Sequence, residues 1–218
     1  CGGVPGKLNK NHTALRAAPN LAGWVGKPIK KTLENLFRVP VLLENDAALA
    51  GLGEAVYGAG RGHRVVAYLT VGTGVGGVRI VNRKIDEKSS RFEPGHRVII
   101  PGGLRCSCGG RGHLEAYVSG GAFRRKYGMH PERIKYARAW DEAARMLARG
   151  AYHIACRWLP DTVVFGGSMI LGKPAIPFPV IAREFKNRFK HFASVPLLQK
   201  AALHDYSGLY GALAQTLI

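Results

Sequence analysis

The sequence predicts an α/β fold, because short strand patterns alternate along the chain with amphipathic helical patterns. Three apolar runs rich in β-branched residues predict strands over 64–71, 78–81 and 162–165. The longest helical pattern covers 141–159, where apolar side chains recur every three or four residues. A chain of 218 residues can bury a sizeable core, as one large domain or two small ones.

The composition is that of a globular protein with a strongly basic surface. Hydrophobic residues make up 46% of the chain, and the formal net charge is +18. Lys and Arg are scattered, with short local clusters, and no recognised nucleic-acid motif accompanies them. We therefore interpret the charge as a surface that aids solubility and attracts anions such as nucleotides, not as a nucleic-acid interface.

The cysteine pattern indicates a reducing compartment. Four cysteines occur, at Cys1, Cys106, Cys108 and Cys156. They do not form a disulfide framework, so a cytoplasmic location is expected. No apolar run reaches the roughly 18–20 residues that span a bilayer, and no leader pattern is visible. Because the sequence starts with Cys and reads CGGVPG, we expect that it lacks its natural beginning.

The first part of the chain is turn-rich, with one helix and one strand. A helix is predicted over 29–37 from apolar residues at helical spacing: Ile29, Leu33, Leu36 and Phe37. The apolar run over 40–44 predicts a buried strand, and an Ala-rich pattern over 47–60 predicts a second helix. Asn45 and Asp46 lie at the junction, where Asp is a frequent catalytic base. Spacing alone favours a helix-capping role for Asp46.

Glycines follow two of the predicted strands. The sequence GTGVGG over 72–77 joins two strands in a hairpin, whose N–H groups and Thr hydroxyl can cradle phosphate. A plain glycine hairpin explains the same letters equally well. It is not the dinucleotide fingerprint, because a strand follows it and not a helix. Gly166 and Gly167 end the strand over 162–165 and allow a ligand to approach the backbone closely.

Further helices are predicted over 114–127, 141–159, 181–192 and 209–217. The expected buried face of the 141–159 helix consists of Ala144, Leu147, Ala148, Ala151, Ile154, Ala155 and Trp158. Cys156 lies near this face and is interpreted as a small core residue.

Four potential metal ligands lie within eighteen residues: His96, Cys106, Cys108 and His113. Thiolate and neutral imidazole are preferred ligands of Zn²⁺, and four of them close a tetrahedral structural site. The alternative is two buried thiols and two unrelated histidines in a glycine-rich loop. Gly109, Gly110 and Gly112 lie where the backbone must turn tightly. Glu93 and Glu115 bracket the cluster, which indicates that the metal holds a loop that binds something else.

Five segments, in this order, carry a recognisable pattern. They are LENDAALAGLGEA, YLTVGTGVGG, EPGH followed by CSCGGRGHLEAYVSG, VVFGGS, and AALHDYSGLYGAL. Together they resemble the ROK family, which contains bacterial sugar kinases and sugar-responsive repressors. The resemblance implies an actin-like, ribonuclease-H-like ATPase fold in which two α/β lobes close over a cleft. It also divides the chain into the remainder of an incomplete N-terminal lobe (1–60), a C-terminal lobe (61–205) and a helix returning toward the first lobe (206–218).

The resemblance also implies the roles of individual residues. Asp46 would be the general base that deprotonates the sugar hydroxyl. The residues implied to bind the sugar are Asn45, Glu93, His96, Glu115 and Asn20. His96 would place one ring nitrogen on zinc and turn the other toward the sugar. The implied nucleotide-binding residues are Gly72, Thr73 and Gly74 in a phosphate loop, and Gly166 and Gly167 in an adenosine-binding turn. ATP with Mg²⁺ would be the phosphoryl donor.

The chain departs from the family pattern in three places. His113 stands where the family has a third zinc-binding cysteine, which makes the expected site Cys₂His₂. The family's second Asn is replaced in this chain, at Ala48 or Leu49 depending on register. The family's Asp-x-Gly-x-Thr phosphate loop does not occur before Pro5. A chain without this loop is expected to transfer phosphate hardly at all.

The expected function is phosphorylation of a hexose or N-acetylhexosamine by ATP, with a homodimer expected from the resemblance. The first alternative is a sugar-sensing repressor, whose helix-turn-helix would lie upstream of Cys1 and would be its contact with nucleic acid. The second is an inactive truncated remnant. No membrane contact is expected, and the sequence does not name the sugar.

Overall fold

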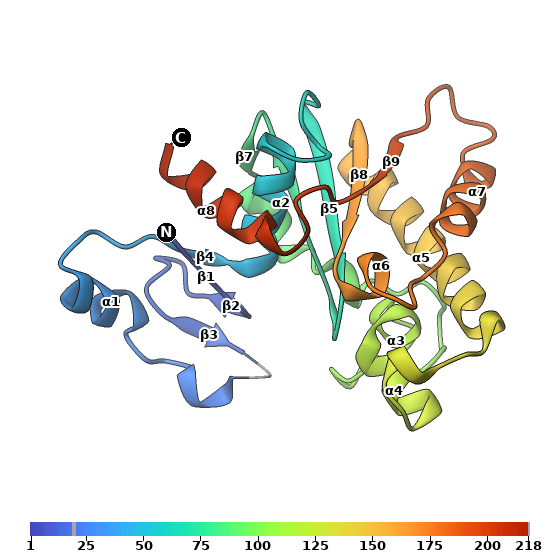
Figure 1. Ribbon diagram of the computed structural model, residues 1–218, viewed down its shortest axis with the longest axis horizontal. Coiled ribbons are helices and arrows are strands. Elements are labelled where there is room, and N and C mark those ends of the chain that lie inside the picture. The colour runs from blue at the N-terminus through green and yellow to red at the C-terminus, as the bar shows by residue number, and fades with distance from the viewer. Residues whose placement is uncertain (19–20, 218) are drawn as a thin grey trace.

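A mixed β-sheet forms the centre of the computed structural model, which describes residues 1–18 and 21–217 (Figure 1). The strand order is β7-β6-β5-β8-β9. The strands are β5 (Val65–Val71), β6 (Val75–Val81), β7 (Lys84–Ile85), β8 (Thr162–Gly166) and β9 (Leu197–Lys200). β5 is antiparallel to β6 and parallel to β8, and β8 is parallel to β9. The carboxyl ends of β5 and β8 therefore lie at the same edge of the sheet.

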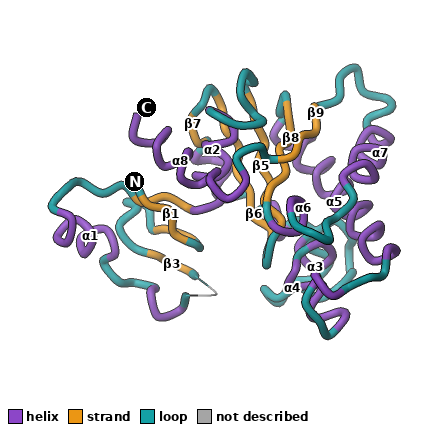
Figure 2. Tube along the Cα trace, in the orientation of Figure 1, coloured by secondary structure: helices purple, strands orange, loops and turns teal. Residues whose placement is uncertain are grey.

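Helices cover both faces of this sheet (Figure 2). On one face lie α2 (Asp46–Val56) and α8 (Ser207–Leu217), and on the other α5 (Ala137–Trp158) and α7 (Phe178–Arg188). Three shorter helices are α3 (Glu115–Val118), α4 (Gly120–Tyr127) and α6 (Ser168–Leu171). Short 3₁₀ helices cover Ala22–Trp24, Glu87–Arg91, Pro94–His96, Pro131–Arg133 and His204–Tyr206. Among the described helices, none combines the length and apolar character needed to cross a lipid bilayer.

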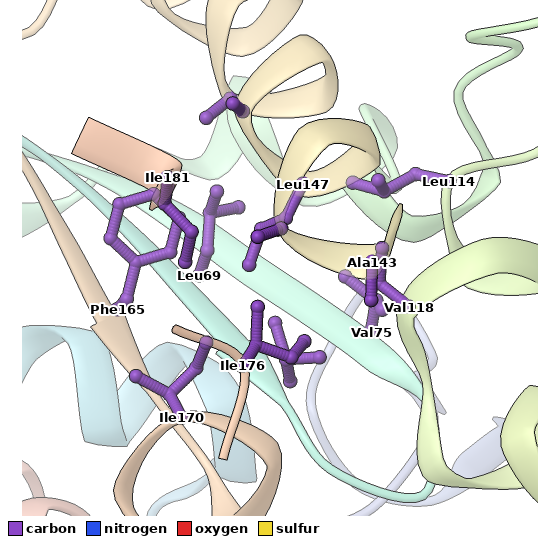
Figure 3. Close-up of a cluster of buried hydrophobic side chains, with 14 of the residues drawn as sticks. Leu69, Val75, Leu114, Val118, Ala143, Leu147, Phe165, Ile170, Ile176 and Ile181 are labelled. Carbon is purple, nitrogen blue, oxygen red and sulfur yellow. The ribbon is translucent and has the colours of Figure 1, made fainter. Parts of the chain in front are cut away.

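The main core lies between the sheet and the α5–α7 layer (Figure 3). Successive residues of a strand point to opposite faces, so Leu69 packs against α5 and α7 while Tyr68 packs under α2. Phe165, Leu147 and Ile181 meet Leu69 in this core, all at most 1% exposed. Burial on both faces explains why β5 is almost continuously apolar.

The N-terminal part of the chain forms a separate small core (Figure 1, left). There β1 (Gly2–Val4) pairs in parallel with β4 (Leu43–Asn45), and β2 (Lys7–Leu8) pairs with β3 (Leu15–Ala17). Helix α1 (Ile29–Phe37) has the predicted bounds. Its apolar pattern does not mark a fully buried face, because Leu36 and Phe37 are 68% and 61% exposed.

Several other predicted elements differ from the structure. The helix predicted over 114–127 is broken at Ser119, which adopts extended backbone and accepts a hydrogen bond from Ala122 N–H at 3.0 Å. The predicted buried face of α5 is confirmed, but the helix starts four residues before the predicted 141. Cys156 is exposed and is not a core residue. Strands β1, β2, β3, β7 and β9 were not predicted.

Candidate functional site

The four predicted metal ligands lie together. Their ligand atoms are all within 4.8 Å of one another. Cys106 Sγ is 3.8 Å from His96 Nδ1, and Cys108 Sγ is 3.2 Å from His113 Nδ1. Around a tetrahedral Zn²⁺ with bonds of about 2.0–2.3 Å, neighbouring ligand atoms lie about 3.3–3.8 Å apart. These two distances are close to that range, although the four atoms spread over up to 4.8 Å, so the donor set and its clustering are compatible with zinc.

Tight backbone turns shape the metal loop, which we define as residues 96–113. Cys106 N–H donates to Gly110 O at 2.8 Å, and Gly109 N–H donates to Cys106 O at 3.1 Å. Gly112 has φ +72°, and a Cβ there would collide with the Ile100 carbonyl. A Cβ on Gly110 would instead collide with the His113 ring. Burial raises the pKa of the Cys106 thiol, because it disfavours the charged thiolate. A bound divalent cation would stabilise the thiolate and so oppose this effect.

The predicted phosphate loop is a turn at the tip of the β5–β6 hairpin. Gly72 N–H donates to Gly74 O at 2.9 Å, and the Thr73 side chain is exposed. Two backbone amides at the start of α4 donate hydrogen bonds to the carbonyl groups of this turn. Gly120 N–H donates to Gly72 O at 2.7 Å, and Gly121 N–H donates to Thr73 O at 3.0 Å.

The second glycine segment lies beside the first. Gly166 is the register partner of Thr70 in the parallel β5–β8 pair. Gly167 has φ +86°, and a Cβ there would collide with the Val71 backbone. Both segments thus follow the carboxyl ends of neighbouring parallel strands, where open α/β sheets bind their ligands.

Asn45 and Asp46 lie at the junction between β4 and α2 and have different roles there. Asn45 caps the helix by accepting from Ala48 N–H at 3.0 Å, and its Nδ2 donates to Gly6 O at 3.0 Å. The capping role that spacing favoured for Asp46 therefore belongs to Asn45. The Asp46 carboxylate accepts a hydrogen bond from the neighbouring Ala47 N–H, at 2.8 Å. Its side chain reaches solvent, yet desolvation by the surrounding protein raises its pKa, against the opposing Ala47 hydrogen bond.

The start of β6 lies between two of these segments. A Cβ on Gly76 would lie 3.2 Å from Ala47 Cβ, so the first turn of α2 rests beside Gly76, two residues after the Gly72–Thr73–Gly74 turn. The 3₁₀ helix Pro94–His96 rests on the same strand, because a Cβ on Gly77 would lie 3.0 Å from Pro94 Cγ. Asp46 and the Glu93–His96 segment therefore flank one short stretch of β6.

The three remaining sugar-site candidates of the C-terminal region already have protein partners. Glu93 has φ +47° and forms an ion pair with Lys7 at 2.9 Å. Lys7 was not identified from the sequence, because no motif marks it. Glu115 accepts hydrogen bonds on both carboxylate oxygens, as described below. His96 is half-buried and turns Nδ1 toward Cys106. Asn20 lies outside the described residues.

The comparison with protein families decides the relationship of this chain. The model of the ROK family matches residues 2–217. The chain belongs to the ROK family. The solved ROK hexokinase of Thermus thermophilus has a TM-score of 0.86 and 31% identity, covering 98% of this chain and 76% of that one. A ROK glucokinase of Streptomyces griseus, solved with glucose and AMPPNP, has a TM-score of 0.78 and 27% identity, covering 98% and 80%. The predicted actin-like, ribonuclease-H-like fold is confirmed.

Curated relatives of this ROK chain include both enzymes and repressors. The glucokinase of Streptomyces coelicolor is 39% identical over 127 residues, which are 56% of this chain and 39% of the relative. The xylose repressor of Bacillus spizizenii is 34% identical over 135 residues, which are 61% of this chain and 35% of the relative. The aligned stretches thus span well under two thirds of these relatives.

Proposed function

We propose that the protein transfers the terminal phosphoryl group of ATP to a hydroxyl of a hexose or N-acetylhexosamine. The observation that carries the proposal is the position of Asp46, which is free of the capping role and lies beside the start of β6 and its glycine turn. The glucokinase relatives support the substrate class. Bound ATP with Mg²⁺ would supply the transferable phosphoryl group.

In this proposal Asp46 accepts the proton of the attacking sugar hydroxyl. A general base works best when its pKa lies near the working pH, and desolvation shifts Asp46 in that direction. Asn45, Glu93, His96 and Glu115 bind sugar hydroxyls, with Asn20 as a further candidate. The turn Gly72–Thr73–Gly74 binds phosphate oxygens, and Gly166 and Gly167 receive the adenosine.

The metal loop would hold one structural Zn²⁺ through His96, Cys106, Cys108 and His113. With Nδ1 of His96 turned toward Cys106, its Nε2 is available to a sugar hydroxyl, so the metal would fix the ring orientation. Protein purified without added zinc should contain about one Zn per chain. Metal-free protein that is well folded would contradict this assignment.

The lobe boundaries and the assembly remain proposals. We assign residues 1–60 to the N-terminal lobe, 61–205 to the C-terminal lobe and 206–218 to a helix returning to the first. The packing of α8 on α2 supports the last assignment, because Gly53 and Gly211 bring the two helices into backbone contact. We also propose a homodimer, by likeness to the family.

Sugar-dependent ADP release tests the proposed function. We would assay a panel of hexoses with the 218-residue chain and with the full-length gene product that contains this sequence. Turnover with a hexose or N-acetylhexosamine, abolished by Asp46→Asn, is the expected result. Folded, zinc-loaded full-length protein without turnover on any sugar would overturn the proposal.

The xylose repressor relatives favour a second candidate, a sugar-responsive repressor. In that case the full-length protein would show no turnover but would bind DNA and release it on addition of a sugar. Protein with neither property would be an inactive remnant.

A further inference from the structure

One carboxylate joins the metal loop to the glycine turn. Glu115, the first residue of α3, follows the metal ligand His113 by two positions. Its Oε1 accepts a hydrogen bond from Ser107 Oγ at 3.0 Å and lies 3.9 Å from Cys106 Sγ. Its Oε2 accepts a hydrogen bond from Val75 N–H at 2.9 Å. Glu115 therefore contacts a metal ligand and its neighbour on one side, and the exit of the glycine turn on the other.

The glycine at position 74 makes this contact possible. A Cβ on Gly74 would lie only 2.8 Å from Glu115 Oε2. Gly74 has an ordinary negative φ, so its backbone conformation does not require glycine. The space that its missing side chain leaves is filled by the carboxylate of Glu115.

The tip of the hairpin depends on the segment that Glu115 begins. The β5–β6 ladder ends at the Val71–Val75 pair, so residues 72–74 lie beyond it. Their carbonyl groups accept hydrogen bonds from Gly120 and Gly121, and Val75 N–H is held by Glu115. Residues 115–121 thus hold both sides of the turn, and this segment starts directly after the metal loop.

We infer that Glu115 is a positioning residue that couples order in the metal loop to the position of the Gly72–Thr73–Gly74 turn. When the metal ligands are fixed, Ser107, the neighbour of the ligand Cys106, holds Oε1 through its hydroxyl, and the rigid carboxylate holds Val75 through Oε2. Loss of the metal frees the Ser107 side of this bridge and loosens the turn. That the turn binds a nucleotide rests on the proposed function. The coupling between the metal loop and the turn does not depend on it.

Hydrogen exchange at Val75 tests the coupling without any assay of activity. We would compare the Val75 amide in zinc-loaded wild-type chain, in chain stripped with EDTA, and in Glu115→Ala. Glu115→Ala removes the hydrogen bond to Val75 and should speed exchange about tenfold, whereas stripping the wild type frees only the Ser107 side and should speed exchange by a smaller factor, like Ser107→Ala. Removing the metal from Glu115→Ala with EDTA should change the Val75 exchange rate little further, because the contacts of the Glu115 carboxylate with Ser107 and Val75 are already absent. Amides of β5 inside the ladder should not change.

The conservative variant separates this bridge from a general loss of structure. In Glu115→Gln the amide oxygen can accept from Val75 N–H while the NH₂ group donates to Ser107 Oγ, because a hydroxyl is both donor and acceptor. Exchange at Val75 should therefore stay within about twofold of wild type. Ser107→Ala, which cuts only the metal-loop side, should speed exchange moderately and is the variant to use if Glu115→Ala does not fold.

Two results would overturn the inference. In one, stripping the metal speeds exchange within residues 106–112 but leaves Val75 unchanged in wild type. In the other, Glu115→Ala raises the KM for the sugar but alters neither the KM for ATP nor Val75 exchange, which would leave Glu115 as a sugar ligand alone. Absence of turnover in the full-length wild type and in every full-length variant would contradict the proposed function and would leave the exchange result standing.

Discussion

At the residue scale, the junction between β4 and α2 contains two adjacent residues, Asn45 and Asp46, either of which could cap α2 as judged from the sequence. In the structure Asn45 is the cap, which leaves Asp46 for the proposed role of general base. Asn45 uses both ends of its amide, one to cap α2 and one to hold the Gly6 carbonyl. Asp46 is consequently free of the capping role, and its side chain is exposed. Ala48 and Leu49, where the family's second Asn is replaced, are both buried and pack in the interior.

The pKa of Asp46 predicts the acid side of the activity profile. Desolvation raises this pKa, and a base works only when ionised, so kcat/KM should fall as the pH falls through the raised value. Asp46→Asn should lower kcat by about 10²- to 10⁴-fold. A pH–rate profile of the full-length protein measures both effects. If Asp46→Asn keeps some activity and its kcat/KM still falls at the same low pH, the fall is caused by the titration of another group.

The same shift has a consequence for stability. Because the folded-state pKa lies above the unfolded one, the contribution of Asp46 to stability is fully present at low pH and is lost as the pH rises through the folded-state value. Removing the charge should therefore not destabilise the fold at neutral pH. Urea unfolding of Asp46→Asn at pH 7 should give a midpoint no lower than wild type, and a lower midpoint would contradict the stated direction.

At the element scale, the metal loop depends on individual glycines for different reasons. Gly112→Ala adds both an unfavourable positive φ and a collision with the Ile100 carbonyl. Gly102→Ala is the matched control, since Gly102 has φ +68° with open space around its Cβ position. The control should cost about 1–2 kcal/mol, the ordinary cost of a left-handed Ala. Gly112→Ala should cost more and should also lower the zinc content, measured by metal analysis and urea unfolding.

Glu54 joins α2 to the segment that leads into α8. Its buried carboxylate accepts hydrogen bonds from the N–H groups of Ala59, Ala202 and Leu203, and from Ser207 Oγ, at 2.8–3.0 Å. Every partner is a donor, so the site is built for an acceptor with two oxygens. The chain end is therefore fixed to α2 by side-chain chemistry as well as by helix packing.

Glu54→Gln should destabilise the protein by about 2–4 kcal/mol, because the NH₂ group would face buried donors and leave them without an acceptor. Ser207→Ala removes one donor and leaves the carboxylate intact, so it should cost only about 1 kcal/mol. Urea unfolding measures both. Equal losses for the two variants would show that the hydroxyl contact alone accounts for the effect of Glu54.

At the scale of the whole molecule, the charge of +18 bears on the binding of anions. A positive surface raises the local concentration of an anionic ligand, and salt screens this attraction. Affinity for ATP should therefore fall several-fold between about 50 mM and about 500 mM NaCl, whereas affinity for an uncharged sugar should not change. Calorimetric titration of both ligands measures the difference. Equal losses for ATP and sugar would indicate a change in the protein and not screening.

The features that depend on near neighbours in the chain could be predicted without a structure. Strands β5 and β8, helix α1 and the buried face of α5 were predicted because periodicity is local. The clustering of the four potential metal ligands was predicted because they lie within one short loop, whose spacing limits how they can meet. The family was recognised from segments that are each continuous in the chain.

Tertiary structure alone decided the contacts between distant segments. The short strands β1 and β9 exist because partners far along the chain pair with them, and Leu36 stays exposed because nothing in the described residues covers it. The partners of Glu115 and the ion pair of Lys7 with Glu93 likewise join separate elements. No local pattern encodes such contacts, because each depends on where the fold places the second partner.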